Sequence, residues 1–320
     1  MNEQATIGIL DQFQTDLIRA CRRVPNKGFF LVLLGCWLGM FQCLGNSTLG
    51  YFKTASLFGW LRDTYNTLLP DGSYTDDRLG LWIPFLVLGL LWWKREDLLK
   101  IPLRTWWPGL LLVALGVALH VVGYLIQQPR LSVLALFTGV YGLAGLAWGP
   151  QLLSRIFFPY FLFVFCIPFS TALDSITFHL RLMSSQLVEW IAHGVFSIDV
   201  VRDGTILRNP SGQYQYEVAG ACSGIHSLMS IGLMGTIAAF LFFHTWWRRA
   251  LLILAAAPLA VAGNAVRLLS IIIAAEVGGQ SWGNWIHDGG PYGVISLLPY
   301  VPAFFGLLWL CKWLKEPLPT

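Results

Sequence analysis

A thiol stands at the start of a long apolar segment, within a run of small residues. Gly220 and Gly224 flank Cys222, His226 follows four residues after the cysteine, and apolar residues continue to Phe243. In the first turn of a membrane-spanning helix, unpaired backbone N–H groups and the positive helix end would favour the thiolate. The same N–H groups could hold a developing oxyanion. This stretch therefore predicts a cysteine nucleophile.

Alternatives stay open within this stretch. A cysteine in an apolar run usually acts as an inert small hydrophobe, but the small and ionisable neighbours of Cys222 favour the nucleophile. Ser223 is the alternative nucleophile, although a helix cap is the simpler interpretation of its position. His226 shares a helix face with Cys222, so it could serve as the base, contact a substrate or pack.

A second candidate is an arginine inside an apolar segment. Arg267 is preceded by Asn264 three residues earlier, so the two share one helix face. An intramembrane arginine is costly and normally marks a functional site. Arginine stays protonated, so it could stabilise an oxyanion or thiolate, or bind a substrate carbonyl or carboxylate. The structural alternative is an ion pair with Glu276 or Glu217.

A third candidate is His287, which lies in a segment rich in glycine and tryptophan. Histidine is the usual proton shuttle near neutral pH. A lone loop histidine is usually structural, but His287 is expected on the same membrane side as Cys222 and Arg267. The remaining histidines are interpreted as structural or interfacial: His120, His179, His193 and His244.

Composition sets the class of protein. The 320 residues are 56% hydrophobic and 12% charged, whereas a soluble domain is roughly 25% charged. Several apolar stretches approach the ~20 residues that cross a bilayer. The six cysteines form no CxxC pair and no zinc spacing, so neither a metal nor another cofactor is expected. No basic-aromatic patch indicates nucleic-acid binding.

The expected fold is an all-α polytopic membrane protein with about eight transmembrane helices. These are predicted at about 28–45, 79–93, 106–126, 131–149, 152–170, 221–243, 250–275 and 293–311. Gly149-Pro150 ends the fourth of them. Residues 276–292, rich in glycine and tryptophan, are expected to form a loop.

An extracytoplasmic insertion is predicted at 171–219. In residues 171–197, polar and charged side chains interrupt the apolar pattern, which indicates an amphipathic helix. Residues 198–219 then change to a period of two, with turn signals at Asp203-Gly204 and at 209–212. We expect a small β-hairpin here, leading the chain to Cys222.

Basic residues predict the orientation. With both termini inside, the clusters near 19–27, 94–104, 248–249 and 312–315 all fall on the cytoplasmic side. Residues 1–27 then form a cytoplasmic segment, 28–311 a single integral-membrane domain, and 312–320 a cytoplasmic tail. Cys222 is consequently expected on the extracytoplasmic face.

The combination of these motifs resembles a known family. Ala221-Cys222-Ser223-Gly224-Ile225, Asn264-Ala265-Val266-Arg267 and His287 together resemble the exosortase/archaeosortase family, over at least residues 80–311. The resemblance departs at His226, where many relatives carry Arg or Asn. The choice of base therefore stays open between His226 and His287.

The resemblance implies a cysteine protease or transpeptidase of the prokaryotic inner or plasma membrane. Its substrates would be membrane-anchored exported proteins with a short C-terminal motif of the PEP-CTERM type, a transmembrane helix and a basic cluster. Cys222 would be the nucleophile, Arg267 the essential arginine and His287 the acid/base, supported by Gly220, Ser223, Gly224, His226 and Asn264. The new C-terminus would pass through a thioester to an unknown acceptor, with a lipid or polysaccharide possible.

Two other functions compete with this one. A transporter or a lipid/polysaccharide flippase would use Arg267 as an anion site, although no inverted repeat relates the halves. A structural partner of an envelope assembly would need neither Cys222 nor His287. A rhomboid-like serine protease is disfavoured because its serine motif is not evident.

Overall fold

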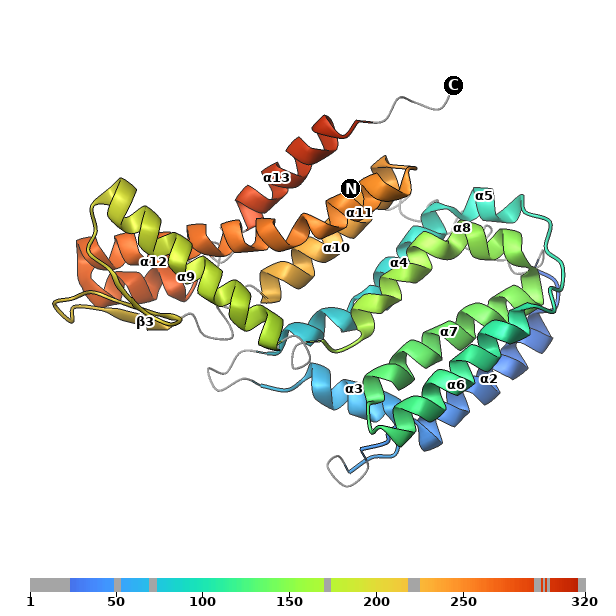
Figure 1. Cartoon of the computed structure of the whole chain (residues 1–320). Coiled ribbons are helices and arrows are strands. Elements are labelled where there is room, and N and C mark those ends of the chain that lie inside the picture. Colours follow the sequence, from blue (N-terminus) through green and yellow to red (C-terminus); the bar gives the residue numbers. More distant parts are fainter. Residues whose placement is uncertain are drawn as a thin grey trace, which may run out of the picture. The chain divides into compact units, whose positions relative to one another are not determined.

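The computed structural model describes residues 24–48, 53–68, 74–169, 174–217, 225–290, 295, 297 and 300–315, most of them helical (Figure 1). The chain divides into two compact units, Met1–Pro168 and Phe169–Thr320. Of the predicted site residues, Gly220, Cys222, Ser223 and Gly224 lie outside the described residues, as does the side chain of His226.

The described elements of the first unit are all helices. Its elements are α2 (Lys27–Leu44), α3 (Leu57–Tyr65), η1 (Asp76–Leu81), α4 (Ile83–Trp93), α5 (Arg95–Leu99), α6 (Gly109–Leu125), α7 (Pro129–Trp148), α8 (Pro150–Phe161) and η2 (Leu162–Cys166). Helix α7 packs against both α2 and α6. Proline at the first helical position starts α7 and α8, where its missing N–H costs nothing.

The second unit combines helices with a small sheet. Its elements are α9 (Asp174–Phe196), β1 (Val201–Asp203), β2 (Ile206–Arg208), β3 (Gln215–Glu217), α10 (Ile225–Phe242), α11 (Trp246–Leu254), α12 (Ala256–His287) and α13 (Tyr300–Trp313). Helix α10 and the beginning of α12 pack with α11 and α13 around an apolar core. This core includes Ile231, Phe243, Leu252 and Leu307.

The predicted fold class is confirmed. Among the described residues, three helical stretches are long and apolar enough to cross a membrane: Lys27–Leu44, Pro129–Trp148 and Trp246–His287. Shorter apolar helices overlap four of the five other predicted spans, at Ile83–Trp93, Gly109–Leu125, Pro150–Cys166 and Leu228–Phe242. Helix α13 overlaps the last predicted span, 293–311. The count of eight spans and the N-in/C-in orientation stay predictions.

The insertion before the cysteine contains the expected helix and turns. Helix α9 covers the amphipathic stretch, and the two turn signals join three antiparallel strands in the order β1-β2-β3. Asp203 pairs with Ile206 around the first turn, and Arg208 pairs with Gln215 across the second. The sheet therefore extends the predicted hairpin by one strand.

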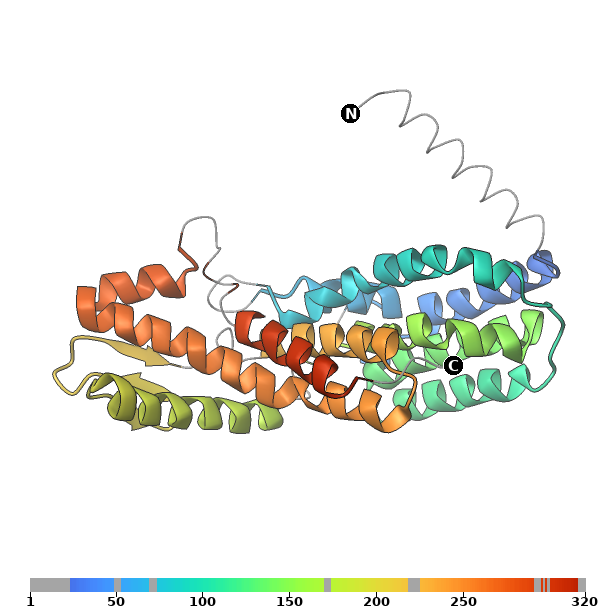
Figure 2. The ribbon, with the colours of Figure 1, turned by 90° about the horizontal axis from the view of Figure 1, so that it is seen from above.

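Helix α12 differs from the sequence prediction. Residues 276–292 were expected to form a loop, but the helix continues to residue 278, breaks at Gly279 and resumes until His287. We call residues 256–278 the first arm and residues 280–287 the second arm. Figure 2 shows the second arm folded back along the first. The glycine-rich signal marked a reversal between two helices.

Candidate active site

The reversal of α12 depends on one backbone conformation. Gly279 has φ 72° and ψ −174°, a region that is essentially restricted to glycine. A second glycine lets the two arms approach closely. A Cβ on Gly283 would lie 2.9 Å from the Ala275 Cβ and would collide with the Tyr216 hydroxyl. These contacts hold the second arm against both the first arm and the sheet.

Strand β3 anchors the beginning of the second arm. The Gln280 side-chain amide accepts from the Gln215 N–H at 3.2 Å and donates to the Gln215 carbonyl at 3.4 Å. The Tyr216 hydroxyl donates to the Gln280 carbonyl at 3.2 Å. An amide side chain thus occupies the hydrogen-bonding positions that a further strand would take at this edge of β3.

The second β-turn is tied to the end of the first arm. Glu276 accepts hydrogen bonds from Tyr214 at 3.1 Å and from Asn209 at 3.3 Å. Burial, together with the bond to the Glu276 carboxylate, raises the pKa of Tyr214 to about 12. Glu276 was considered as a structural ion-pair partner of Arg267, but its carboxylate is held by the sheet instead.

An apolar core lies beneath these polar contacts. It is formed by α9, the sheet and the middle of α12, which lie side by side in Figure 1. Val188, Leu207, Tyr214, Leu268 and Ile272 are all nearly fully buried in it. This core fixes the sheet and both arms of α12 as one assembly.

Arg267 meets the end of the second arm. Its Nη2 donates to the main-chain carbonyl of His287 at 3.2 Å, although the two residues are 20 positions apart in the chain. The last carbonyls of a helix lack intrahelical partners and carry partial negative charge. The guanidinium therefore caps the second arm, and the fold brings two predicted catalytic residues together.

His287 has a carboxylate beside its ring. Its Nδ1 lies 3.3 Å from Asp288 Oδ1, and the two side chains are 40% and 77% exposed. A carboxylate at Nδ1 favours the tautomer with the proton on that nitrogen, which leaves Nε2 as a proton acceptor. Asp288 was not predicted as a site residue, although its position next to the histidine was a visible signal.

Asn264 is buried one helical turn before Arg267. The residue is 3% exposed, and its Nδ2 has no hydrogen-bond partner among the described residues. A buried amide donor left unpaired costs about 1–3 kcal/mol. Its position makes it a candidate to donate to a bound substrate.

Two other histidines have structural contacts, as expected. His120 contacts the Ser132 hydroxyl at 3.0 Å, and His193 contacts the Val200 carbonyl at 2.9 Å. His193 also lies 3.5 Å from an Asp199 carboxylate oxygen. Within the described part of the chain, no group of His, Cys, Asp and Glu side chains could hold a metal ion.

The apolar helices, the folded-back α12 and its Arg–His contact together define an integral membrane protein with a polar site built on one helix. Residues 73–311 match the family model of the transmembrane exosortases. The chain therefore belongs to the transmembrane exosortase family. Searches of the curated proteins and of the solved structures found no match.

Family membership defines the general role. Transmembrane exosortases act as membrane transpeptidases or proteases on proteins with C-terminal sorting signals. This chain is accordingly an integral membrane protein of that class. The matched region contains the cysteine motif, Arg267 and His287, so the described site lies within the family's own part of the chain.

Proposed function

We propose that this protein is a cysteine transpeptidase that removes a C-terminal sorting signal and transfers the new C-terminus to an acceptor. The signal would consist of a short motif of the PEP-CTERM type, an apolar helix and a basic cluster. The observation that carries the proposal is the contact between Arg267 and His287 across the reversal of α12. It brings the Arg267 guanidinium to the main chain of His287, and the proposal assigns a role to each of these residues.

Cys222 is the nucleophile in this proposal. The family match covers the cysteine motif, and α10 begins at Ile225, three residues further along the chain. The Cys222 thiolate attacks the carbonyl carbon of the scissile peptide, which produces a tetrahedral intermediate with a negative oxygen. The C–N bond then breaks and leaves a thioester on the sulfur.

Arg267 and Asn264 are the proposed donors to the negative oxygen. Both lie on one face of the first arm, and the buried Asn264 amide has an unused N–H among its described neighbours. Arg267 uses one of its N–H groups for the His287 carbonyl. A guanidinium has several further donors, which remain to stabilise the developing charge.

His287 transfers the protons. The reaction begins with a thiolate and an imidazolium, and the imidazolium donates its proton to the departing amine. The neutral ring then takes a proton from the acceptor as that acceptor attacks the thioester, which restores both starting ions. Asp288 at Nδ1 leaves Nε2 as the atom that carries the proton. His226 is the alternative base.

We favour transfer over hydrolysis because the apolar helix α10 packs against α12 and would limit the access of water to a thioester on Cys222. Exclusion of water protects a reactive thioester until a stronger nucleophile arrives. The acceptor is proposed to be an envelope lipid or polysaccharide. The active face is proposed to be the extracytoplasmic side of the prokaryotic plasma membrane, where exported substrates are retained by their C-terminal helix.

The decisive experiment compares the mature C-terminus of a candidate substrate in cells with the native protein and with Cys222→Ala. A suitable substrate is encoded in the same genome and ends in a shared motif, one apolar helix and a basic cluster. Mass spectrometry is expected to find the shortened, acceptor-linked form only with the native protein. Cys311→Ala, in the same unit, is the matched control and should process normally.

Normal processing by Cys222→Ala would overturn the proposal. The transporter alternative predicts that outcome, together with strong sensitivity to Arg267→Lys. An accumulated shortened substrate without an acceptor would instead identify a protease that hydrolyses its thioester.

A further inference from the structure

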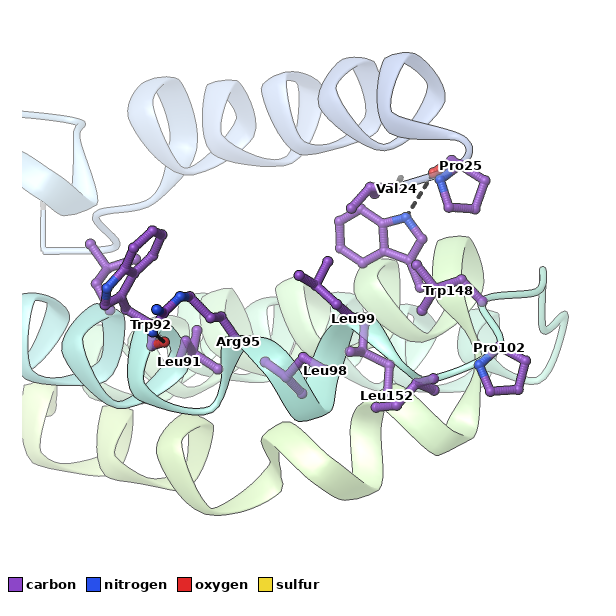
Figure 3. A pocket seen from close by; sticks show the side chains of 13 residues that line it. Val24, Pro25, Leu91, Trp92, Arg95, Leu98, Leu99, Pro102, Trp148 and Leu152 are labelled. Carbon is purple, nitrogen blue, oxygen red and sulfur yellow. Dashed lines mark hydrogen bonds between the residues drawn. The ribbon is translucent and has the colours of Figure 1, made fainter. Parts of the chain in front are cut away.

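A cavity of about 550 Å³ lies in the first unit, apart from the candidate active site. Figure 3 shows its walls, which come from the residues before α2, from α4 and α5, and from the junction of α7 and α8. Its lining includes Pro25, Trp92, Arg95, Leu98, Trp148 and Leu152. The volume lies within the ~300–1,000 Å³ typical of small-molecule sites.

Among the described residues that line the cavity, Arg95 is the one charged side chain, and most of the others are apolar. The Arg95 guanidinium carbon lies 4.7 Å from the ring centroid of Trp92, and Arg95 Nη1 donates to the Trp92 carbonyl at 3.3 Å. The opposite end is fixed by the Trp148 indole, which donates to the Pro25 carbonyl at 2.9 Å. The arginine side chain is thus held in the wall of the cavity beside Trp92.

The segments around the cavity are strongly basic. Residues 24–27, 88–104 and 148–155 contain six basic side chains and two acidic ones. The basic side chains are Lys27, Lys94, Arg95, Lys100, Arg104 and Arg155. Such an excess beside membrane helices marks the cytoplasmic leaflet, where anionic lipids collect.

We propose that this cavity binds an anionic phospholipid, with an acyl chain inside it and the phosphate at Arg95. The lining fits an amphiphile, because an acyl chain can contact the apolar walls while a charged headgroup binds the arginine. A small soluble anion would contact only the arginine. The surplus of positive charge favours a net-negative headgroup over a zwitterionic one. The bound lipid would join α2, α4–α5 and the start of α8, a role independent of the proposed cleavage.

A photoactivatable lipid tests the site directly. The full chain is reconstituted in nanodiscs with phosphatidylglycerol carrying a diazirine in its acyl chain, and adducts are mapped by mass spectrometry. Adducts are expected in residues 88–103 and 148–152. Diazirine phosphatidylcholine should label these peptides at least about fivefold less, as expected from the ~1 kcal/mol that one basic residue contributes near a charged surface.

Two variants separate charge from shape. Arg95→Gln should lower labelling by phosphatidylglycerol about fivefold, and Leu98→Trp should lower labelling by filling the cavity. Lys100→Gln is the matched control, because Lys100 follows directly after α5, the helix that begins with Arg95, and the substitution also removes one positive charge. Lys100 pairs with Asp97 at 3.6 Å and is not among the residues that line the cavity. Thermal unfolding in detergent checks that each variant is folded.

Three results would overturn the proposal. Equal labelling by the two lipids would show only general contact with the bilayer, and unchanged labelling of Arg95→Gln would remove the role of the cation. Labelling that appears only after residues 2–20 are deleted would mean that the chain's own N-terminal segment occupies the cavity. Substrate cleavage is measured separately, so these outcomes do not depend on the proposed function.

Discussion

Arg267 caps the second arm and could also bind an anionic group of a substrate. A guanidinium in an apolar segment needs a partner of negative character, and the carbonyl that ends the second arm supplies one. A neutral carbonyl balances the charge only in part. Because no carboxylate in the described part of the chain forms an ion pair with it, the guanidinium keeps an electrostatic affinity for an oxyanion or a carboxylate.

Replacing Arg267 by Lys tests this dual role. Lysine keeps the charge but loses the planar arrangement of donors, so it cannot cap the second arm and contact a substrate together. We expect the cleavage rate to fall by at least about 100-fold, the typical loss of an oxyanion donor. The rate is measured by loss of the substrate's C-terminal helix.

Arg249→Lys is the matched control for this prediction. Arg249 also donates from its side chain to a main-chain carbonyl, that of Phe243, at 2.7 Å. A similar loss of activity in both variants would point to general destabilisation of the second unit and would contradict a specific role for Arg267.

The pair of His287 and Asp288 makes a graded prediction. His287→Gln should lower the cleavage rate by about 10²–10⁴-fold, as the loss of a general acid–base does. Asp288→Asn should lower it less than about tenfold, because exposed ion pairs contribute ~1 kcal/mol or less. Single-turnover cleavage measures both rates, and His226→Gln alongside identifies the base. A larger loss in the His226 variant would assign the role to that residue.

At the residue scale, the sequence pointed to candidate site residues but not to the contacts that those residues make. Arg267 and Asn264 stood out because ionisable or amide groups are costly in apolar segments. His287 stood out because histidine is the usual proton shuttle near neutral pH. Nothing in the sequence indicated that a carbonyl would be the partner of Arg267, since every residue carries one. Asp288 was overlooked because acidic residues are ordinary in loops, and the segment was interpreted as a loop.

At the scale of elements, the reversal of α12 is the main departure from the sequence. Residues 276–292 contain several glycines and tryptophans, which in isolation indicate a turn or an irregular segment. Residues 280–287 are nevertheless helical, because contacts with residues distant in the sequence hold them in place. Gln280 and Gly283 pack on Gln215 and Tyr216 of β3. A short helix of this kind gains its stability from tertiary packing and not from propensity.

Gly279→Ala tests whether the reversal matters. A Cβ at this position meets no atom within 4 Å, so the cost arises from the backbone conformation alone and amounts to about 1–3 kcal/mol. We expect a lower unfolding temperature in detergent and a large loss of cleavage. Gly194→Ala in α9 is the matched control, because a Cβ there also meets nothing, and its φ is not in the glycine-favouring range.

Wild-type cleavage by Gly279→Ala would contradict the link between the reversal and the site. The control should be neutral or slightly stabilising, as alanine in a helix is favoured over glycine.

The sheet was easier to predict than the reversal. Two turn signals and a period of two marked residues 198–219, since strands and tight turns use local residue types. The prediction was a hairpin, and the structure adds a third strand after the second of those turns.

At the scale of the whole molecule, hydrophobicity and charge indicate the class but not every boundary. Helix α4 has 11 residues, or about 16 Å of helix, against a hydrocarbon core of ~30 Å. Neighbouring segments must complete such a span, and the number of crossings therefore cannot be obtained from helix lengths. The distribution of basic residues supplies the independent signal.

Fusions to a reporter enzyme that is active only outside the cytoplasm test the predicted orientation. A fusion after Gln213 in the exposed turn between β2 and β3 should be active, and one after Lys315 should be inactive. The charge distribution predicts this difference because basic clusters resist export. A paired reporter that is active only in the cytoplasm serves as the control, and activity of the export reporter after Lys315 would refute the eight-span topology.

The turn at Gly279 also limits how the site can deform. Arg267 and His287 belong to a single helical hairpin, so a tilt or shift of that hairpin carries both groups along and preserves their separation. Cys222 precedes a different helix, α10. If these three residues form the catalytic set, the main motion that can bring them together or separate them is the approach of the Cys222 thiol to the hairpin. A substrate helix that inserts beside α10 would change mainly this distance.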